Sequence, residues 1–190
     1  NIANWGPYNV HDPSVIKVGN TYYCYNTDVS FGSEVRPGIQ IRKSEDLINW
    51  EWIGWAFSGL PAKGAAYIRI KGGTPFQALW APYRMKGGKE YRLYYSLSSS
   101  TGRLSTMGLA TSDNPEGPWV EKDLVVSSEP GGAVQTNAID PSVVVTPIDN
   151  RDDIIAPDRL QSPIVTDVPN DNGTAVYVEF ELSDASDIDH

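Results

Sequence analysis

The chain has 190 residues and is acidic, with 24 Asp and Glu against 15 Lys and Arg, a net charge of −9. This balance argues against nucleic acid or an anionic membrane as partner, because both require basic patches. No run of 18 apolar residues occurs, so no transmembrane helix is expected. The first residues lack the basic-then-apolar pattern of a signal peptide, so if the protein is exported, this is its mature form. We expect a secreted or periplasmic location.

Few residues are suited to redox chemistry or metal binding. Cys24 is the only cysteine, which excludes an intrachain disulfide, and we interpret it as a small buried hydrophobic residue. His11 and His190 are the only histidines, so a zinc site with three histidines is excluded. The residues therefore predict no cofactor and no metal ligand.

Short strands separated by turns fill the first third of the chain. Residues 15–18 and 21–26 alternate around Gly19-Asn20, which is typical of a hairpin turn. Residues 38–42 alternate apolar and polar side chains, as a half-buried strand should, and residues 49–53 form another strand. This part of the sequence predicts four short strands and no amphipathic helix.

The same order of features returns further along the chain. A strand follows Pro82, a turn is expected at Gly87-Gly88, and residues 90–96 form a second aromatic strand. Trp119 follows Trp50 by 69 positions, and a third unit opens at Asn137. Repeated units of four strands favour an all-β fold of propeller blades over a sandwich.

The repeat stops after the opening of the third unit. Residues 147–153 are polar and rich in turn formers, and residues 174–182 alternate as a clean strand. We predict a partial β-propeller over residues 1–146, with about two blades and the start of a third, and a linker with a sandwich-like strand tail over 147–190. The tail resembles the first strands of a fibronectin type III-like domain. A propeller closes with about 4–8 blades, so exposed strand edges favour self-association or a partner chain.

Two aspartates lie in matching contexts. His11-Asp12-Pro13-Ser14 recurs as Ile139-Asp140-Pro141-Ser142, each ahead of a β-rich segment. Proline restricts the residue before it, so each carboxylate is held on a stiff backbone. The pair predicts a site assembled from equivalent edges of a repeated unit. The alternative is that each Asp-Pro-Ser is only a turn that opens a strand.

Several motifs in order resemble glycoside hydrolase family 43, and its endo-arabinanases in particular. They are His11-Asp12-Pro13-Ser14, Gly38-Ile39, Ser44 to Trp50, Leu79-Trp80-Ala81-Pro82, Tyr94-Tyr95-Ser96, Gly108 to Ser112, Gly117-Pro118-Trp119 and Asn137 to Pro141. The resemblance covers residues 5 to 145 and implies five-bladed propellers whose site lies in a central funnel. It also implies cleavage of α-L-arabinofuranosyl linkages in plant arabinan, with inversion at the anomeric carbon.

The resemblance gives both aspartates a role. Asp12 corresponds to the general base that activates water, and Asp140 to the carboxylate that positions the general acid and raises its pKa. The acid in the family is a Glu followed by Ala-Pro, whereas Ile155-Ala156-Pro157 lacks the carboxylate. Glu179 and Glu181 lie in surroundings that match no family motif. On this basis we expect the chain as it stands to be inactive or nearly so.

Three further residues are candidates for substrate binding. Trp80 either forms a wall of the funnel, where its ring stacks on a sugar, or packs between blades. Asn137 either hydrogen-bonds sugar hydroxyls or caps a turn, and His11 either orients Asp12 or is structural. The family implies a structural central ion such as calcium, but no metal ligand is assigned to this chain. Tyr83 stands where many members have Asp, which weakens that subsite.

Two hypotheses follow from these observations. The first is a family 43 hydrolase acting on a polysaccharide, arabinan or arabinoxylan. The second is a catalytically inactive carbohydrate-binding or assembly module derived from such an enzyme. The sequence does not separate arabinan from xylan, nor endo from exo cleavage.

Overall fold

The structure is a computed structural model that describes residues 9–29, 36–128, 137–143, 164–167 and 176–179. The chain divides into two compact units, Asn1–Pro141 and Ser142–His190. Each unit is described by itself. The boundary predicted at residue 146 lies a few residues after this division.

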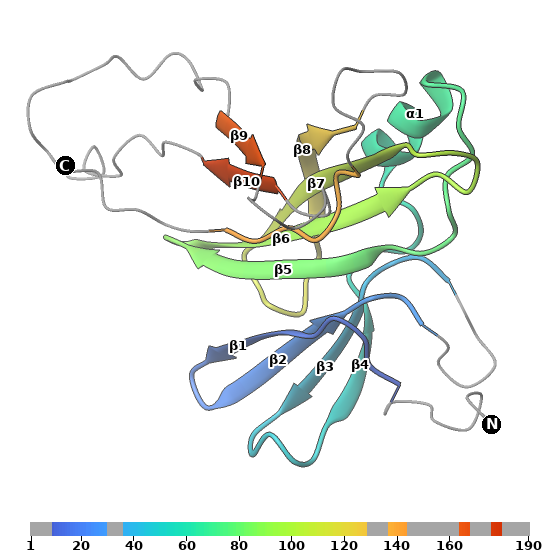
Figure 1. Cartoon of the computed structure of the whole chain (residues 1–190). Coiled ribbons are helices and arrows are strands. Elements are labelled where there is room, and N and C mark those ends of the chain that lie inside the picture. The colour runs from blue at the N-terminus through green and yellow to red at the C-terminus, as the bar shows by residue number, and fades with distance from the viewer. Residues whose placement is uncertain (1–8, 30–35, 129–136, 144–163, 168–175, 180–190) are drawn as a thin grey trace, which may run out of the picture. The chain divides into compact units, whose positions relative to one another are not determined.

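The first sheet is an antiparallel meander of four strands, drawn in blue to teal in Figure 1. Its strands are β1 (Ser14–Val18), β2 (Thr21–Asn26), β3 (Gln40–Ser44) and β4 (Glu51–Trp55). Gly19 turns the β1–β2 hairpin with φ of 60°, a conformation that glycine adopts at no steric cost. Each strand pairs only with its sequence neighbours in this sheet, which is the topology of a propeller blade.

The second sheet repeats this topology with longer strands (Figure 1). Its strands are β5 (Trp80–Gly87), β6 (Glu90–Ser98), β7 (Ser105–Ser112) and β8 (Val120–Ser127). The turn between β5 and β6 falls one residue later than predicted, because Gly88 takes the left-handed conformation with φ of 59°. The predicted all-β fold of two propeller blades is confirmed.

One helix, α1 (Ala62–Ile70), lies between the two sheets in the sequence. The prediction of no helix was wrong here. The buried side of α1 consists of Gly64, Ala65 and Ile68, and it packs on β6, β7 and β8. Small residues bury little apolar surface, so the hydrophobic pattern that identifies a helix in a sequence is weak in this segment.

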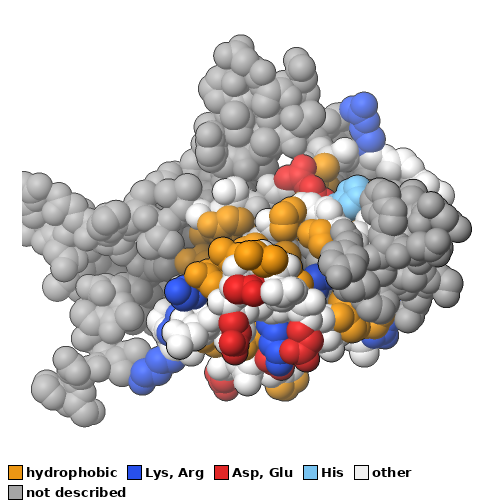
Figure 2. Space-filling view, turned by 90° about the horizontal axis from the view of Figure 1, so that it is seen from below, with side chains coloured by type: hydrophobic (Ala, Val, Ile, Leu, Met, Phe, Trp, Pro, Cys, Tyr) orange, Lys and Arg blue, Asp and Glu red, His pale blue; other side chains and the backbone are white. Residues whose placement is uncertain are grey.

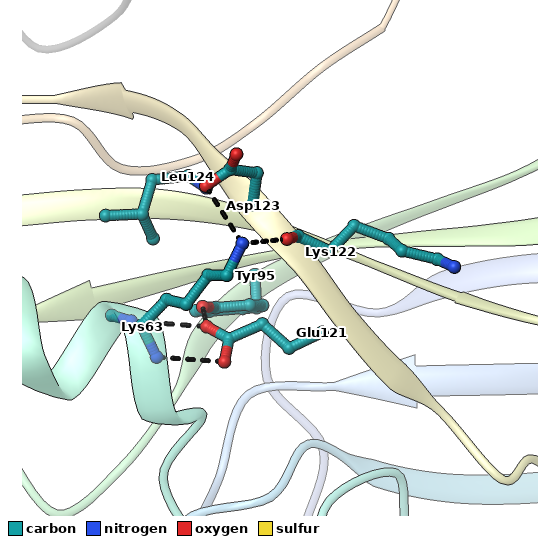
Figure 3. Close-up of polar contacts among 7 residues, drawn as sticks. Lys63, Tyr95, Glu121, Lys122, Asp123 and Leu124 are labelled. Carbon is teal, nitrogen blue, oxygen red and sulfur yellow. Dashed lines mark hydrogen bonds and ion pairs between the residues drawn. The ribbon is translucent and has the colours of Figure 1, made fainter.

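A carboxylate from β8 completes the start of α1, as Figure 3 shows. Pro61 precedes the helix and provides no side-chain cap. Instead, Glu121 accepts hydrogen bonds from the backbone N–H groups of Lys63 (2.9 Å) and Gly64 (3.2 Å). The Tyr95 hydroxyl donates to the same carboxylate at 2.6 Å. Glu121 thereby satisfies helix N–H groups that have no partner within the helix.

The two blades share one hydrophobic core that extends under α1. Fully buried members include Tyr25 and Ile39 from the first blade and Leu93, Tyr95 and Leu97 from the second. Cys24 is buried and free, and burial raises the pKa of its thiol to about 11, so it packs as a small hydrophobic residue.

Direct contacts also join the blades at their interface. Tyr25 on β2 packs edge-on against the ring of Trp119, with ring centroids 5.8 Å apart, and its hydroxyl donates to the carbonyl of Pro115. The backbone N–H of Arg84 donates to the Ser14 hydroxyl at 3.0 Å. The blades are therefore held together by specific side chains as well as by apolar burial.

The second unit contains an antiparallel pair, β9 (Ile164–Asp167) and β10 (Val176–Glu179). These strands lie within the segments predicted as the strand tail. The β-rich segment predicted after Asp140-Pro141-Ser142 falls mostly outside the described residues, which end at Val143 in this part of the chain.

The surface of the described residues is mixed in charge. Lys43 lies 3.7 Å from Glu51 and 3.5 Å from Glu116, and Figure 2 shows acidic and basic side chains next to one another among hydrophobic ones. Among the helices that the structure describes, none is long and apolar enough to cross a membrane.

Candidate active site

Three backbone positions with positive φ mark the openings of successive repeats. Asp12 has φ of 48°, Ala81 has 40° and Asp140 has 58°, and each is followed by a proline. Positive φ is uncommon outside glycine and concentrates at functional sites and turns. At this position the repeat thus carries a carboxylate in its first and third copies, Asp12 and Asp140, and a methyl group in its second, Ala81.

Thr27 fixes the carboxylate of Asp12. Its hydroxyl donates to Asp12 Oδ2 at 2.6 Å and accepts the backbone N–H of Ala81 at 2.8 Å. The backbone N–H of Thr27 donates to the carbonyl of His11 at 3.0 Å. Asp12 itself is exposed, whereas Thr27 is buried, so a buried hydroxyl holds an accessible carboxylate.

Asp140 is anchored to the second blade by its backbone. Its N–H donates to the hydroxyl of Ser96 on β6 at 3.1 Å, and the N–H of Ala138 donates to the hydroxyl of Ser105 on β7 at 2.7 Å. Both serines are fully buried. The chain leading into the third repeat is therefore fixed against β6 and β7.

The two carboxylates are close enough to influence each other. The pKa of Asp140 is raised above its ordinary value of 3.8. The larger cause is burial, which removes water from the carboxyl group, and the smaller is the negative charge of Asp12. This coupling joins two residues 128 positions apart in the sequence. That the two carboxylates form one site, as the repeated Asp-Pro-Ser motif indicates, stays a prediction.

The predicted substrate-binding residues differ in their surroundings. Trp80 is half-buried, and its ring lies 5.2 Å from that of Phe76 with a tilt of 58°. Phe76 is 40% exposed and was not identified from the sequence, although an exposed aromatic ring beside Trp80 enlarges the apolar surface available to a sugar. His11 is exposed and Asn137 is half-buried.

Asp28 is a buried acid that the sequence did not indicate. Its Oδ2 accepts the backbone N–H groups of Gly38 (2.7 Å) and Leu79 (2.8 Å), while its Oδ1 has no hydrogen-bond partner. Burial raises the pKa of this carboxyl to about 7, against the opposing effect of the backbone hydrogen bonds. Asp28 thus ties the segment before β5 to the first blade.

The described residues offer no metal centre. They contain no group of three or more His, Cys, Asp or Glu side chains that could hold an ion. No ligand is therefore assigned to the central ion that the resemblance implies.

Two four-stranded antiparallel meanders in tandem define the class of β-propeller proteins. The family model of the glycosyl hydrolases family 43 matches residues 6–150. The chain belongs to this family.

Characterised relatives share about a third of the aligned residues. The extracellular endo-α-(1→5)-L-arabinanase 1 of Bacillus subtilis (strain 168) is 33% identical over 144 residues, which cover 74% of this chain and 42% of the relative. The arabinan endo-1,5-α-L-arabinosidase B of Emericella nidulans is 35% identical over 143 residues, covering 71% and 32%. The chain thus spans well under half the length of these relatives.

Solved structures agree with this relationship. The native Bacillus subtilis arabinanase Arb43A superposes with a TM-score of 0.61 at 30% identity, over 72% of this chain and 44% of that one. A Cellvibrio cellulosa α-L-arabinanase complexed with arabinohexaose gives 0.59 at 29% identity, over 72% and 41%.

Proposed function

We propose that this chain supplies the blades bearing Asp12 and Asp140 to a glycoside hydrolase that cleaves α-L-arabinofuranosyl linkages of arabinan. The observation that supports the proposal is that Asp12 and Asp140 take the same positive-φ position before a proline in the first and third repeats, with the charge of Asp12 raising the pKa of Asp140. The endo-arabinanase relatives support the substrate class, and arabinoxylan is the related alternative.

Asp12 is the general base in this proposal. An inverting glycosidase needs a carboxylate that takes a proton from water while a separate acid protonates the leaving oxygen. The Thr27 hydroxyl donates to Asp12 Oδ2 at 2.6 Å and so holds the carboxylate in one orientation. Asp12 is also exposed, which gives water access to it.

Asp140 provides a second negative charge beside the reacting groups. A carboxylate close to the general acid raises the pKa of that acid and keeps it protonated near neutrality. The 190 residues contain no Glu-Ala-Pro motif to supply the acid. General acid–base catalysis contributes about 10²–10⁴-fold in rate, so we expect turnover by this chain to be lower than that of its relatives by about that factor.

The aromatic pair of Phe76 and Trp80 favours a second candidate function. Aromatic rings of this kind can bind arabinan without cleaving it. In that case the segment acts as a carbohydrate-binding or assembly module, and self-association or a partner chain completes the ring.

One assay separates the two functions. Release of reducing ends from linear arabinan is compared among the wild type, Asp12→Asn and Asp140→Asn, with xylan as a parallel substrate. Asp113→Asn serves as a matched control because Asp113 is an exposed aspartate on the loop after β7. The hydrolase function is supported if Asp12→Asn and Asp140→Asn lose cleavage while the wild type and Asp113→Asn retain it. Equal rates in all four proteins contradict it. Binding of arabinan without turnover supports the binding module.

A further inference from the structure

The same inter-blade hydrogen bond occurs twice. Thr27 directly follows β2, and Ser96 lies near the end of β6, the second strand of the other blade. Each is opposite the residue before a positive-φ position: the Thr27 N–H donates to the His11 carbonyl, and Ser96 pairs with Trp80. Each hydroxyl accepts the backbone N–H of the residue that opens the next repeat. The Ala81 N–H donates to Thr27 Oγ1 at 2.8 Å, and the Asp140 N–H donates to Ser96 Oγ at 3.1 Å.

The two copies differ in where the hydroxyl proton goes. A threonine hydroxyl has one proton and two acceptor lone pairs. The Ala81 N–H occupies one lone pair of Thr27, and the single proton is directed at Asp12 Oδ2, 2.6 Å away. In the Ser96 copy the position equivalent to Asp12 is Ala81, which has no carboxylate to accept the proton. The contact between the Thr27 hydroxyl and the Asp12 carboxylate is thus present in addition to the structural hydrogen bond that both copies share.

We propose that Thr27 is a positioning residue for the base. It fixes Asp12 through a relay that runs from the Ala81 N–H through the Thr27 hydroxyl to Asp12 Oδ2. This proposal rests on the proposed function of Asp12 as the group that activates water. The relay occupies Oδ2, so it leaves Asp12 Oδ1 as the oxygen that takes the proton from water. It also makes the orientation of the base depend on the second blade, because Ala81 lies at the start of β5.

The relay has a particular kinetic signature. A hydrogen bond to an ionised group is among the strong ones in proteins, and a misplacement of about 1 Å costs about 10²-fold in rate. Thr27→Val keeps the shape of the side chain and removes the hydroxyl, so we expect kcat on linear arabinan to fall by about 10–100-fold. KM should change little, since the Thr27 side chain is buried. Thr27→Ser retains the hydroxyl and should restore most of kcat.

Thr106→Val is the matched control. Thr106 is a fully buried threonine whose hydroxyl interacts only within the second blade, with the Val126 carbonyl at 3.0 Å and the Ser127 hydroxyl at 2.7 Å. The Thr106→Val variant loses a buried threonine hydroxyl that takes no part in the Thr27–Asp12 contact. We therefore expect its kcat to be within about two-fold of wild type. Circular dichroism of each variant establishes that it is folded.

A second measurement does not require turnover. Urea unfolding midpoints of Thr27→Val, Asp12→Ala and the double variant form a double-mutant cycle. If the relay exists, Thr27→Val shifts the midpoint less in the Asp12→Ala background than in the wild type.

The outcomes divide cleanly. A selective loss of kcat rescued by Thr27→Ser, with non-additive midpoints, supports the proposal. Any one of three results would overturn it. The first is additive midpoints, and the second is equal activity of Thr27→Val and Thr106→Val. The third is a fall in kcat together with a rise in KM that Thr27→Ser does not rescue. If the wild type releases no reducing ends, the proposed function fails while the cycle still decides whether Thr27 holds Asp12.

Discussion

Asp28 illustrates how a single buried acid can make stability depend on pH. Its carboxyl has a pKa of about 7 in the folded protein and 3.8 as its ordinary value. The folded state therefore keeps this proton to higher pH than the unfolded chain. The contribution of Asp28 to stability is complete below pH 3.8 and is lost as the pH rises to about 7.

Asp28→Asn should remove this contribution. The difference between the two pKa values corresponds to about 4 kcal/mol of pH-dependent stability. We expect the wild type to lose stability relative to Asp28→Asn between pH 3.8 and about 7. Urea unfolding of both proteins across this range tests it. A constant difference between them at every pH would show that Asp28 does not titrate in the folded state.

Gly108 is required by the packing of Tyr95. It lies on β7 directly opposite Tyr95 in the β6–β7 register, and a Cβ atom at Gly108 would lie 2.3 Å from the tyrosine ring. Gly108→Ala should destabilise the protein by about 1–3 kcal/mol through overpacking. Thermal unfolding measures the loss. Gly59→Ala is the control, because a Cβ there meets no atom within 4 Å, and equal melting temperatures for the two variants would contradict the account.

The sequence was most informative at this scale where residues repeat. Asp12 and Asp140 could be paired because the Asp-Pro-Ser motif occurs twice, and the charge of Asp12 contributes, after burial, to the raised pKa of Asp140. Thr27 and Asp28 could not be found, because Thr and Asp are ordinary residues after a strand. Their roles depend on Ala81 and Leu79, which are more than 50 positions away and come close only when the blades pack.

At the scale of elements, the strands could be predicted because their signal is local, and the helix was missed because its signal is not. The strands alternate side chains around glycine turns, which is a local signal. Helix α1 has a short buried side of Gly64, Ala65 and Ile68, and its start is completed by Glu121, a residue of β8. A cap supplied from 58 positions away has no local sequence signature.

The capping role of Glu121 can be tested directly. Glu121→Ala leaves the N–H groups of Lys63 and Gly64 and the Tyr95 hydroxyl without this acceptor, so we expect a loss of about 1–3 kcal/mol in unfolding free energy. Urea unfolding gives the value. Glu45→Ala, at an exposed position, should change stability by less than about 0.5 kcal/mol. A similarly small effect of Glu121→Ala would mean that water replaces the cap.

At the scale of the molecule, a buried cation lies at the interface between the blades. The guanidinium of Arg84 is 4.3 Å from the ring centroid of Tyr91, 5.2 Å from that of Tyr25 and 5.9 Å from that of Trp119. Its three nitrogens have no hydrogen-bond partner, and burial lowers the pKa of the group. Cation–π attraction to three rings therefore offsets the cost of removing the charge from water.

Because the cation–π attraction and the cost of burying the charge oppose each other, the volume of the Arg84 side chain should contribute more to stability than its charge. Arg84→Met keeps a long side chain between the rings and should lie within about 1 kcal/mol of the wild type. Arg84→Ala opens a cavity and should cost about 2–4 kcal/mol. Unfolding free energies of the pair decide the question. Equal losses in both variants would show that the positive charge itself holds the blades together.

The central claim is that the negative charge of Asp12 acts on the carboxyl group of Asp140, and NMR can test it most directly. The pKa of the Asp140 side chain is followed through its carboxyl carbon signal in the wild type and in Asp12→Asn. The account predicts a pKa above 3.8 in the wild type, and a lower one in Asp12→Asn because the neighbouring charge is gone. An Asp140 pKa that is the same in both proteins would contradict the account.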